Sequence, residues 1–338
     1  MPNIAINGFG RIGRNTLKAG LGKAGFTVVA INDLTSPAIL AALLQNDTVH
    51  GRYGKRVTHG DKWIAINGKK IPVLSERDPL RLPWKKLKVD IVLECTGFFT
   101  TQEAASAHVK AGAKGVIISA PSKGGNVPTY VKGVNHDDLK QETATVIDNA
   151  SCTTNCTAPV MAILEEAFGV EKAMMSTIHA YTSTQVLQDG PNKDPRRSRA
   201  AAANIVPTST GAAIAVTEAI PSLKGIFDGM AFRVPVIDGS VTDFTVLLKK
   251  NVTVAQVNAA FKKAAKAPRW KGILEVTDEP LVSSDIIGNP ASSIVNTDLT
   301  MVVDGNFVKV VSWYDNEWGY SMRLAEMAVL YGKTLTKK

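Results

Sequence analysis

The segment that decides the fold reads Ile4-Ala-Ile-Asn-Gly-Phe-Gly-Arg-Ile-Gly13. Its first three residues are apolar, which is typical of a short buried strand. Glycines follow at positions 8, 10 and 13, and a helical pattern continues to about Leu21. Glycines at this spacing between a strand and a helix let a pyrophosphate approach the backbone at the positive end of the helix dipole. The segment therefore predicts a dinucleotide-binding loop formed by Gly8, Gly10 and Gly13.

The next strand supports the same interpretation. Residues 27–31 are rich in β-branched side chains, and Asp33 follows them, 20 residues after Gly13. An acidic residue at this spacing accepts a hydrogen bond from a ribose 2′-hydroxyl, and its charge repels a 2′-phosphate. Asp33 therefore predicts NAD rather than NADP. The alternative is a glycine-rich turn with a capping aspartate.

Strand and helix patterns alternate through the rest of the first half. Asn67-Gly68 predicts a type I′ hairpin turn, and Cys95-Thr-Gly97 follows a buried strand, where a dinucleotide is expected to bind. The expected strands are 63–66, 70–74, 91–94, 116–119 and 145–147, and the expected helices are 37–44 and 101–111. Such alternation predicts a parallel, doubly wound sheet of the Rossmann type, an α/β fold.

A second segment, Ala150-Ser-Cys-Thr-Thr-Asn-Cys156, predicts chemistry rather than fold. Ser151 is a good N-cap, and helical apolar spacing follows it, so Cys152 is expected at a helix N-terminus. The helix dipole favours an anion there, which predicts a lowered thiol pKa and a reactive nucleophile. A buried structural cysteine is the alternative. We expect Cys156 to be a small packing residue, although one helical turn from Cys152 it is also near enough for an oxidative disulfide.

The second half predicts an α+β domain with a mostly antiparallel sheet covered by helices on one face. Residues 183–206 form a long polar and basic segment, which predicts a functional loop or an interface. The expected strands are 171–182, 231–237, 241–249, 270–276, 300–304 and 307–314, and the expected helices begin after Gly211 and cover 252–265 and 317–330. We predict an NAD-binding domain of residues 1–151, joined by a C-terminal helix over 317–338, and a catalytic domain of residues 152–316 that includes the loop 183–206.

Composition limits the function classes. The 338 residues are 45% hydrophobic and carry a net charge of +9, which suits anionic ligands. Three cysteines do not form a disulfide framework, and no membrane span or signal peptide is visible, so we expect a cytoplasmic protein. No metal site is expected. Apart from His179, the histidines are expected at the surface, namely His50, His59, His108 and His136.

The chain resembles phosphorylating glyceraldehyde-3-phosphate dehydrogenases from nearly end to end. The matching motifs are the two segments quoted above, Glu94-Cys-Thr-Gly97, Thr208-Ser-Thr-Gly-Ala-Ala213 and Trp313-Tyr-Asp-Asn-Glu-Trp-Gly-Tyr320. The resemblance implies NAD as cofactor, glyceraldehyde 3-phosphate and inorganic phosphate as substrates, and a homotetramer in which residues 183–206 reach a neighbour's NAD site.

The resemblance also implies roles for individual residues. Cys152 would be the nucleophile and His179 its base. The attacking phosphate would be bound by Ser151, Thr153, Thr210 and Gly211. The substrate's own phosphate would be bound by Thr182, Arg197 and Arg233. NAD would contact Arg11, Ile12, Asp33, Arg77, Thr96, Ser119 and Asn316, besides the three glycines. For His179, the residue pattern alone leaves a packed strand histidine as an alternative.

Two rival functions stay open at this point. A close relative acts on erythrose 4-phosphate and hydrolyses the thioester, and the predicted attacking-phosphate residues argue against it. The other rival is a nucleic-acid-binding role, as a main or secondary activity. Aromatic residues make up only 6% of the chain and no RRM, KH or zinc pattern is present, which argues against a dedicated module.

Overall fold

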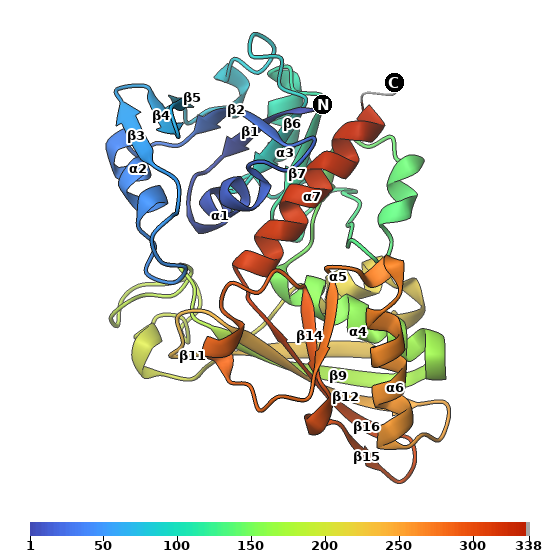
Figure 1. Cartoon of the computed structure of the whole chain (residues 1–338). Coiled ribbons are helices and arrows are strands. Elements are labelled where there is room, and N and C mark those ends of the chain that lie inside the picture. The colour runs from blue at the N-terminus through green and yellow to red at the C-terminus, as the bar shows by residue number, and fades with distance from the viewer. Residues whose placement is uncertain (336–338) are drawn as a thin grey trace. The chain divides into compact units, whose positions relative to one another are not determined.

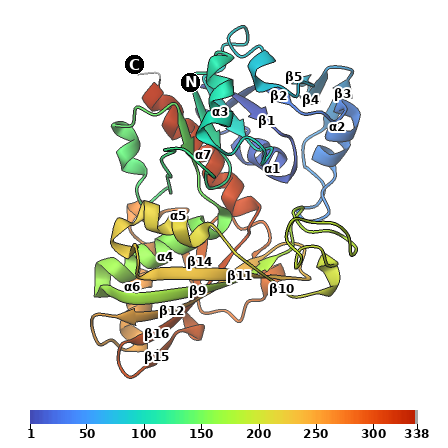
Figure 2. The same cartoon turned by 180° about the vertical axis from the view of Figure 1, so that it is seen from behind.

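A computed structural model describes residues 1–335, which divide into two compact units (Figures 1 and 2). The first unit comprises Met1–Tyr130, His136–Ala150 and the described residues from Ser321 onward. The second comprises Val131–Asn135 and Ser151–Tyr320. Among the described residues, no helix combines the length and the apolar character that crossing a membrane requires.

The first unit is built on one eight-stranded sheet with the order β3-β4-β5-β2-β1-β6-β7-β8. Its strands are β1 (Asn3–Asn7), β2 (Thr27–Asn32), β3 (Val57–Gly60), β4 (Trp63–Ile66), β5 (Lys69–Leu74), β6 (Ile91–Glu94), β7 (Gly115–Ile118) and β8 (Val146–Asp148). Its helices are α1 (Arg11–Gly20), α2 (Pro37–Gln45), α3 (Gln102–Lys110) and most of α7 (Trp318–Leu335). From β5 to β8 all neighbours pair in parallel, which confirms the predicted doubly wound sheet.

Alternation along the central strands explains how this sheet is covered. Ala5 and Val92 pack in one cluster with Ala105 of α3. Ile6, which points to the opposite face, lies against the start of α1 at Gly13. Asn67 and its neighbouring glycine have φ values of 48° and 83°, so the predicted type I′ hairpin between β4 and β5 forms. The short antiparallel strand β3 was not predicted.

The second unit has a mixed, mostly antiparallel sheet with the order β10-β11-β9-β12-β16-β14-β13, and β15 pairs with β16. Its strands are β9 (Val170–Ala180), β10 (Val206–Thr208), β11 (Phe227–Val234), β12 (Ser240–Leu248), β13 (Leu274–Thr277), β14 (Ser293–Asn296), β15 (Met301–Val303) and β16 (Phe307–Tyr314). Its helices are α4 (Cys152–Phe168), α5 (Ala212–Ala219) and α6 (Val254–Ala265). Helix α4 packs on the sheet with α5 and α6 beside it, as Figure 2 shows for α4 and α5.

Some sequence predictions were wrong. The strand expected at 270–276 is instead a 3-10 turn at Pro268–Trp270 followed by β13, and the four-residue strand β14 was missed. His108 does not lie at the surface, because its face of α3 is covered and it finds buried polar partners. The final helix forms as α7, and the last three residues of the predicted span 317–338 lie outside the described residues.

Candidate active site

A pocket of about 600 Å³ lies in the first unit, at the carboxyl ends of β1, β2 and β6. Gly8 has a φ of 90°, and a Cβ there would lie 2.7 Å from the backbone nitrogen of Thr96, so only glycine fits. At Gly10, the N-cap of α1, an added Cβ would meet nothing within 4 Å. A tight turn with open space at a helix N-terminus fits a pyrophosphate.

The structure brings together half of the residues predicted to bind NAD. Those that line the pocket are Gly8, Gly10, Asp33, Arg77 and Thr96. Of the others, Arg11, Ile12 and Gly13 begin α1, Ser119 follows β7, and Asn316 belongs to the second unit. Asp33 is held in place because its two carboxylate oxygens accept from the backbone N–H groups of Phe9, at 2.7 Å, and Thr35, at 2.9 Å.

Several pocket residues were not predicted. These are Asn7, Asn32, Leu34, Glu76, Phe98 and Phe99, whereas Cys95, which also lines the pocket, belongs to the loop that was expected to face a dinucleotide. Leu34 and Phe98 are 56% and 83% exposed, so they offer apolar surface to a planar ligand. For Asn7 and Asn32 the available signal was their position, because each ends a parallel strand, where doubly wound folds bind ligands.

In the second unit, Cys152 is the first residue of α4. Ser151 is the N-cap, and its hydroxyl accepts from the Thr154 N–H at 3.0 Å, as predicted. The Cys152 sulfur lies 3.4 Å from Nε2 of His179, although 27 residues separate them in the chain. Cys156, one turn further, is buried with a free thiol, which fits a packing residue.

His179 lies near the end of β9 and is 3% exposed. Its Nδ1 is 2.7 Å from the Ala180 carbonyl oxygen and 2.8 Å from Nη1 of Arg233, which pairs with His179 across β9 and β11. A carbonyl only accepts and a guanidinium only donates, so Nδ1 can satisfy one of them at a time. In the neutral ring, an Nδ1 that donates to the Ala180 carbonyl leaves Nε2 with a lone pair beside the thiol. An Nδ1 that accepts from Arg233 leaves the ring hydrogen on Nε2.

Burial decides the protonation of this pair. It raises the pKa of the Cys152 thiol, although the Arg233 charge and the N–H and hydroxyl of Thr153 act in the opposite direction. The prediction that the helix terminus lowers this thiol pKa was therefore wrong, because desolvation outweighs the dipole and the neighbouring charge. Burial, and then the Arg233 charge, lower the pKa of His179 to about 3. The resting pair is therefore a neutral thiol beside a neutral imidazole, and a neutral imidazole has one ring nitrogen that can accept a proton.

Comparison with known proteins identifies the family. Residues 2–102 match the model of the NAD-binding domain of glyceraldehyde 3-phosphate dehydrogenase, and residues 151–316 match the model of its C-terminal domain. The chain belongs to the glyceraldehyde-3-phosphate dehydrogenase family. It is 52% identical over 333 residues to the glyceraldehyde-3-phosphate dehydrogenase of Streptomyces coelicolor, covering 98% of this chain and 99% of that one. It is 53% identical over 339 residues to that of Mycobacterium avium, with 98% and 99% covered.

As a member of this family the chain is an NAD-dependent dehydrogenase, and its predicted anion-binding residues have definite surroundings. Arg197 donates from Nε to the Thr208 hydroxyl at 2.9 Å. Thr182 exchanges a hydrogen bond with Thr184 at 2.9 Å, and Thr210 accepts from the Ala212 N–H at 3.2 Å. Gly211 follows Thr210 as the N-cap of α5. The Thr153 hydroxyl points instead to the buried hydroxyl of Tyr314, at 2.9 Å.

Tyr314 is a site residue of this dehydrogenase that sequence reasoning did not assign. Its hydroxyl also bonds Thr177 at 2.8 Å, and its ring meets that of His179 edge-on at 5.9 Å. It therefore connects the helix that carries Cys152 to the strand that carries His179. The signal was present, because Tyr314 belongs to the motif at 313–320, but the motif alone gives no direction for the side chain.

Proposed function

We propose that this dehydrogenase oxidises glyceraldehyde 3-phosphate with NAD and inorganic phosphate to 1,3-bisphosphoglycerate, through a hemithioacetal and a thioester on Cys152. The proposal depends chiefly on one observation: the Cys152 sulfur, at the N-terminus of α4, lies 3.4 Å from Nε2 of a buried, neutral His179. A nucleophile within reach of a positioned base is what covalent catalysis requires. We assign NAD binding to the first unit and covalent chemistry to the second.

In the first step the Cys152 sulfur forms a bond to the aldehyde carbon, and the carbonyl π electrons move to oxygen. His179 takes the thiol proton at Nε2 and returns it to that oxygen, which completes the hemithioacetal. The backbone N–H groups at the start of α4 are suitably oriented to stabilise the developing negative charge. A neutral imidazole is needed here, and the pKa of His179, about 3, keeps it neutral at physiological pH.

In the second step His179 takes the hydroxyl proton of the hemithioacetal. NAD, when bound, supplies the oxidant, because it accepts the hydride from the same carbon and leaves a thioester. In the third step a phosphate oxygen attacks the thioester carbon, the carbon–sulfur bond breaks, and the proton on His179 returns to the Cys152 sulfur. The thioester retains the energy of oxidation, so the product is an acyl phosphate rather than a free acid.

Two anion subsites are proposed for the two phosphates. We propose that Thr182, Arg197 and Arg233 bind the phosphate of the substrate, since forked guanidinium donors match a phosphate well. We propose that Thr210 and the Gly211 N–H, with Ser151 and Thr153, bind the attacking phosphate. Because the Thr153 and Ser151 hydroxyls already have protein partners, these two residues would contribute mainly through their backbone N–H groups.

We also propose a homotetramer in which residues 183–206 contact a neighbouring subunit. Leu187 and Ile205, in or beside this otherwise polar segment, are 81% and 68% exposed, and Met174 on β9 is 65% exposed. A connecting segment of this length is usually functional or an interface element, and a subunit contact would cover its exposed apolar side chains. Sedimentation velocity measures the assembly, and a fully active monomer would contradict the proposal.

NADH formation from glyceraldehyde 3-phosphate, with and without inorganic phosphate, tests the reaction directly. With phosphate we expect steady turnover, and without it a single burst of about one NADH per Cys152, because the thioester has no acceptor. A Cys152→Ser variant should bind NAD and give no burst, since a hydroxyl is a far weaker nucleophile at neutral pH. Full turnover without phosphate would instead support the hydrolytic reaction of the erythrose 4-phosphate relatives.

A further inference from the structure

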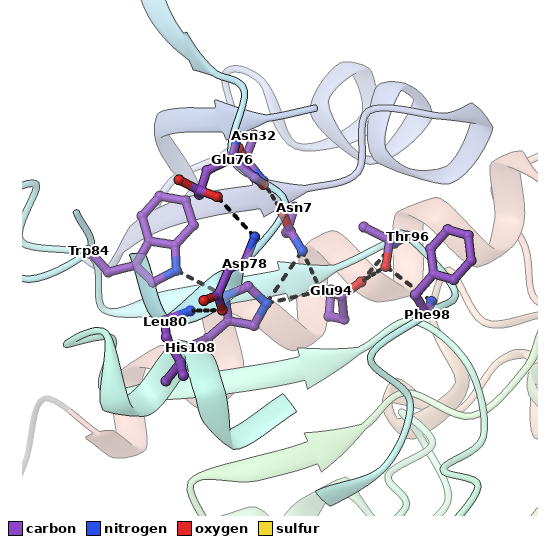
Figure 3. A network of polar contacts seen from close by, with 10 residues as sticks. All are labelled: Asn7, Asn32, Glu76, Asp78, Leu80, Trp84, Glu94, Thr96, Phe98 and His108. Atoms are coloured by element: carbon purple, nitrogen blue, oxygen red, sulfur yellow. Dashed lines mark hydrogen bonds and ion pairs between the residues drawn. The ribbon is translucent and has the colours of Figure 1, made fainter. Parts of the chain in front are cut away.

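A buried polar network lies beneath the dinucleotide pocket and takes no part in the proposed chemistry (Figure 3). Its centre is His108 on α3 and Glu94 at the end of β6, which are 0% and 1% exposed. Nε2 of His108 lies 3.0 Å from Oε2 of Glu94. Polar groups this deeply buried destabilise a protein unless every one is hydrogen-bonded, so their arrangement needs a reason.

Trp84 fixes the tautomer of His108. The Trp84 indole N–H donates to Nδ1 of His108 at 3.0 Å. An indole nitrogen can only donate, so Nδ1 must be the acceptor and the ring hydrogen lies on Nε2. His108 therefore donates to Glu94. The Asn7 amide nitrogen lies 3.4 Å from the same Nε2, but both atoms carry hydrogens, so this contact is not a hydrogen bond.

The Glu94 carboxylate receives donors on both oxygens. Oε2 accepts from His108 and from the Asn7 amide at 2.6 Å. Oε1 accepts from the Thr96 backbone N–H at 2.8 Å and from the Thr96 hydroxyl through a short bond. The carboxylate therefore joins the last residue of β1, through Asn7, to the loop that follows β6.

These bonds restrict what Thr96 can offer a ligand. Its hydroxyl hydrogen is directed to Glu94, and one oxygen lone pair accepts from the Phe98 N–H at 3.1 Å. The remaining hydrogen-bonding capacity of the hydroxyl is a lone pair, so Thr96 can accept from a ligand and cannot donate. Thr96 and Phe98 both line the pocket.

The same network reaches a second segment that lines the pocket, at Glu76. The Asn32 amide donates to the Asn7 side-chain oxygen at 2.7 Å and to the Glu76 carbonyl at 2.9 Å. Its own oxygen accepts from the Glu76 N–H at 2.9 Å. Glu76 also lines the pocket. One chain of bonds thus connects Thr96 to Glu76, through residues that are all drawn in Figure 3.

We propose that Glu94 and His108 are positioning residues for NAD, which hold the Thr96 hydroxyl as an acceptor for a donor group of the cofactor, such as a ribose hydroxyl or an amide N–H. Neither residue touches the ligand in this arrangement. The inference depends on the proposed binding of NAD in this pocket. It assigns a function to two buried ionisable residues that would otherwise only weaken the core.

A double-mutant cycle on NAD affinity, measured by calorimetric titration, tests the proposal. Thr96→Val removes the hydroxyl at nearly constant shape. Glu94→Gln replaces one carboxylate oxygen with an NH₂ group. This group faces the donor of either Thr96 or His108 and cannot accept from it. Each change should weaken NAD binding by about tenfold, the upper end of what is expected for a hydrogen bond between neutral groups. If Glu94 acts through the hydroxyl, the double variant should be about as weak as the weaker single variant.

A second pair of variants covers the case in which Glu94→Gln does not fold. His108→Gln can still present an N–H to Glu94, whereas His108→Leu cannot. The Gln variant should keep NAD affinity within about threefold, the Leu variant should lose about tenfold, and Thr96→Val should largely remove that difference. Urea unfolding and the rate of Cys152 alkylation verify the fold of each variant.

The outcomes separate the two proposals. Losses that multiply in the double variants would show independent effects on the fold and would overturn the positioning role. An unchanged affinity in Thr96→Val would overturn it as well. If Asp33→Gly also left NAD binding unchanged, the assignment of NAD to this pocket would fail too. If Asp33→Gly and Thr96→Val both weaken NAD binding, but the losses from Glu94→Gln and Thr96→Val multiply in the double variant, NAD still binds in this pocket. Only the positioning role of Glu94 and His108 would then be rejected.

Discussion

Two buried histidines, one in each unit, differ in how many hydrogen-bond arrangements their surroundings allow. His108 has one, because Trp84 can only donate to Nδ1 and Glu94 accepts from Nε2. His179 has two, because its Nδ1 lies between the Ala180 carbonyl and the Arg233 guanidinium. A single arrangement suits a residue that holds other groups in place. Two arrangements of similar geometry suit a residue that must give and take a proton.

Because His179 has two possible arrangements, the position of Arg233 determines which tautomer is present. While its guanidinium donates to Nδ1, Nε2 of His179 carries a hydrogen and cannot accept the thiol proton. Arg233 also donates to the Ala180 carbonyl at 3.0 Å. Under the proposed function, a substrate phosphate that draws Arg233 toward itself would free Nδ1 to donate to that carbonyl. Substrate binding would then leave the base in its active tautomer.

The largest effect expected from this comparison is on the rate of hydride transfer. His179→Asn removes the base, and we expect the NADH burst to slow by about 10²- to 10⁴-fold. At the other histidine, His108→Leu should instead raise the NAD concentration needed for half-saturation, whereas His108→Gln should leave it within about threefold. Rapid-mixing absorbance measures the burst at saturating NAD, and a series of NAD concentrations gives the half-saturation value of each variant.

An unaltered burst in His179→Asn would show that His179 only packs. The pH dependence adds a second criterion. The variant lacks a base for the thiol, so its burst rate should continue to rise at alkaline pH, as the thiol ionises unaided. A profile that matches the unmodified enzyme would contradict the assigned role.

The sequence was sufficient for the parallel strands and the glycine loop of the first unit and for the start of α4, because these are determined locally. Glycines at fixed spacing between a strand and a helix require a particular backbone, and the Ser151 cap needs only the next three residues. The partners of the two histidines are not local. Trp84 and Glu94 lie 24 and 14 residues before His108, and only the packing of α3 on the sheet brings them together.

The site in the second unit was predicted as residue types rather than as geometry. The distance from Cys152 to His179 depends on how α4 packs on β9, and Arg233 reaches His179 through the register of β9 and β11. The thiol pKa was predicted in the wrong direction for the same reason, because a helix terminus is visible in a sequence and desolvation is not. The four residues of β14 were missed because their strand is defined by pairing with β13 and β16, which are distant in the sequence.

The next largest effect concerns phosphate. The Thr210 hydroxyl accepts from the Ala212 N–H, so its hydrogen is available to an anion. Thr210→Ala should raise the apparent KM for phosphate by about one to two decades, since a hydrogen bond to a charged group contributes roughly 1.5–3 kcal/mol. The burst of NADH should survive, because phosphate attacks only after the thioester forms. Loss of the burst with an unchanged phosphate KM would move Thr210 to the substrate's own phosphate.

A smaller effect is expected on stability in acid. In the unfolded chain a histidine titrates near its ordinary pKa of 6.5, whereas burial and Arg233 lower the pKa of His179 to about 3. Between these values the unfolded state binds the proton and the folded state does not, so stability is lost as pH falls below 6.5. At pH 5 this amounts to about 2 kcal/mol. In urea unfolding, His179→Asn should lose that much less stability than the unmodified chain between pH 8 and pH 5, and equal losses would exclude a neutral buried His179.

The smallest expected effect concerns Asp33, which lies in the same unit as His108. Asp33 uses its carboxylate oxygens to accept from the N–H groups of Phe9 and Thr35. Asp33→Gly therefore does more than remove a charge that repels a 2′-phosphate, because it also leaves two donors free beside the pocket. NADP affinity should rise by about tenfold and NAD affinity should fall.

Asp33→Asn separates the two contributions, since it removes the charge and keeps an acceptor for one N–H. If charge alone decides, both variants admit NADP equally; if the freed donors matter, only the glycine variant does. Unchanged NADP binding in both would show that Asp33 does not face the ribose.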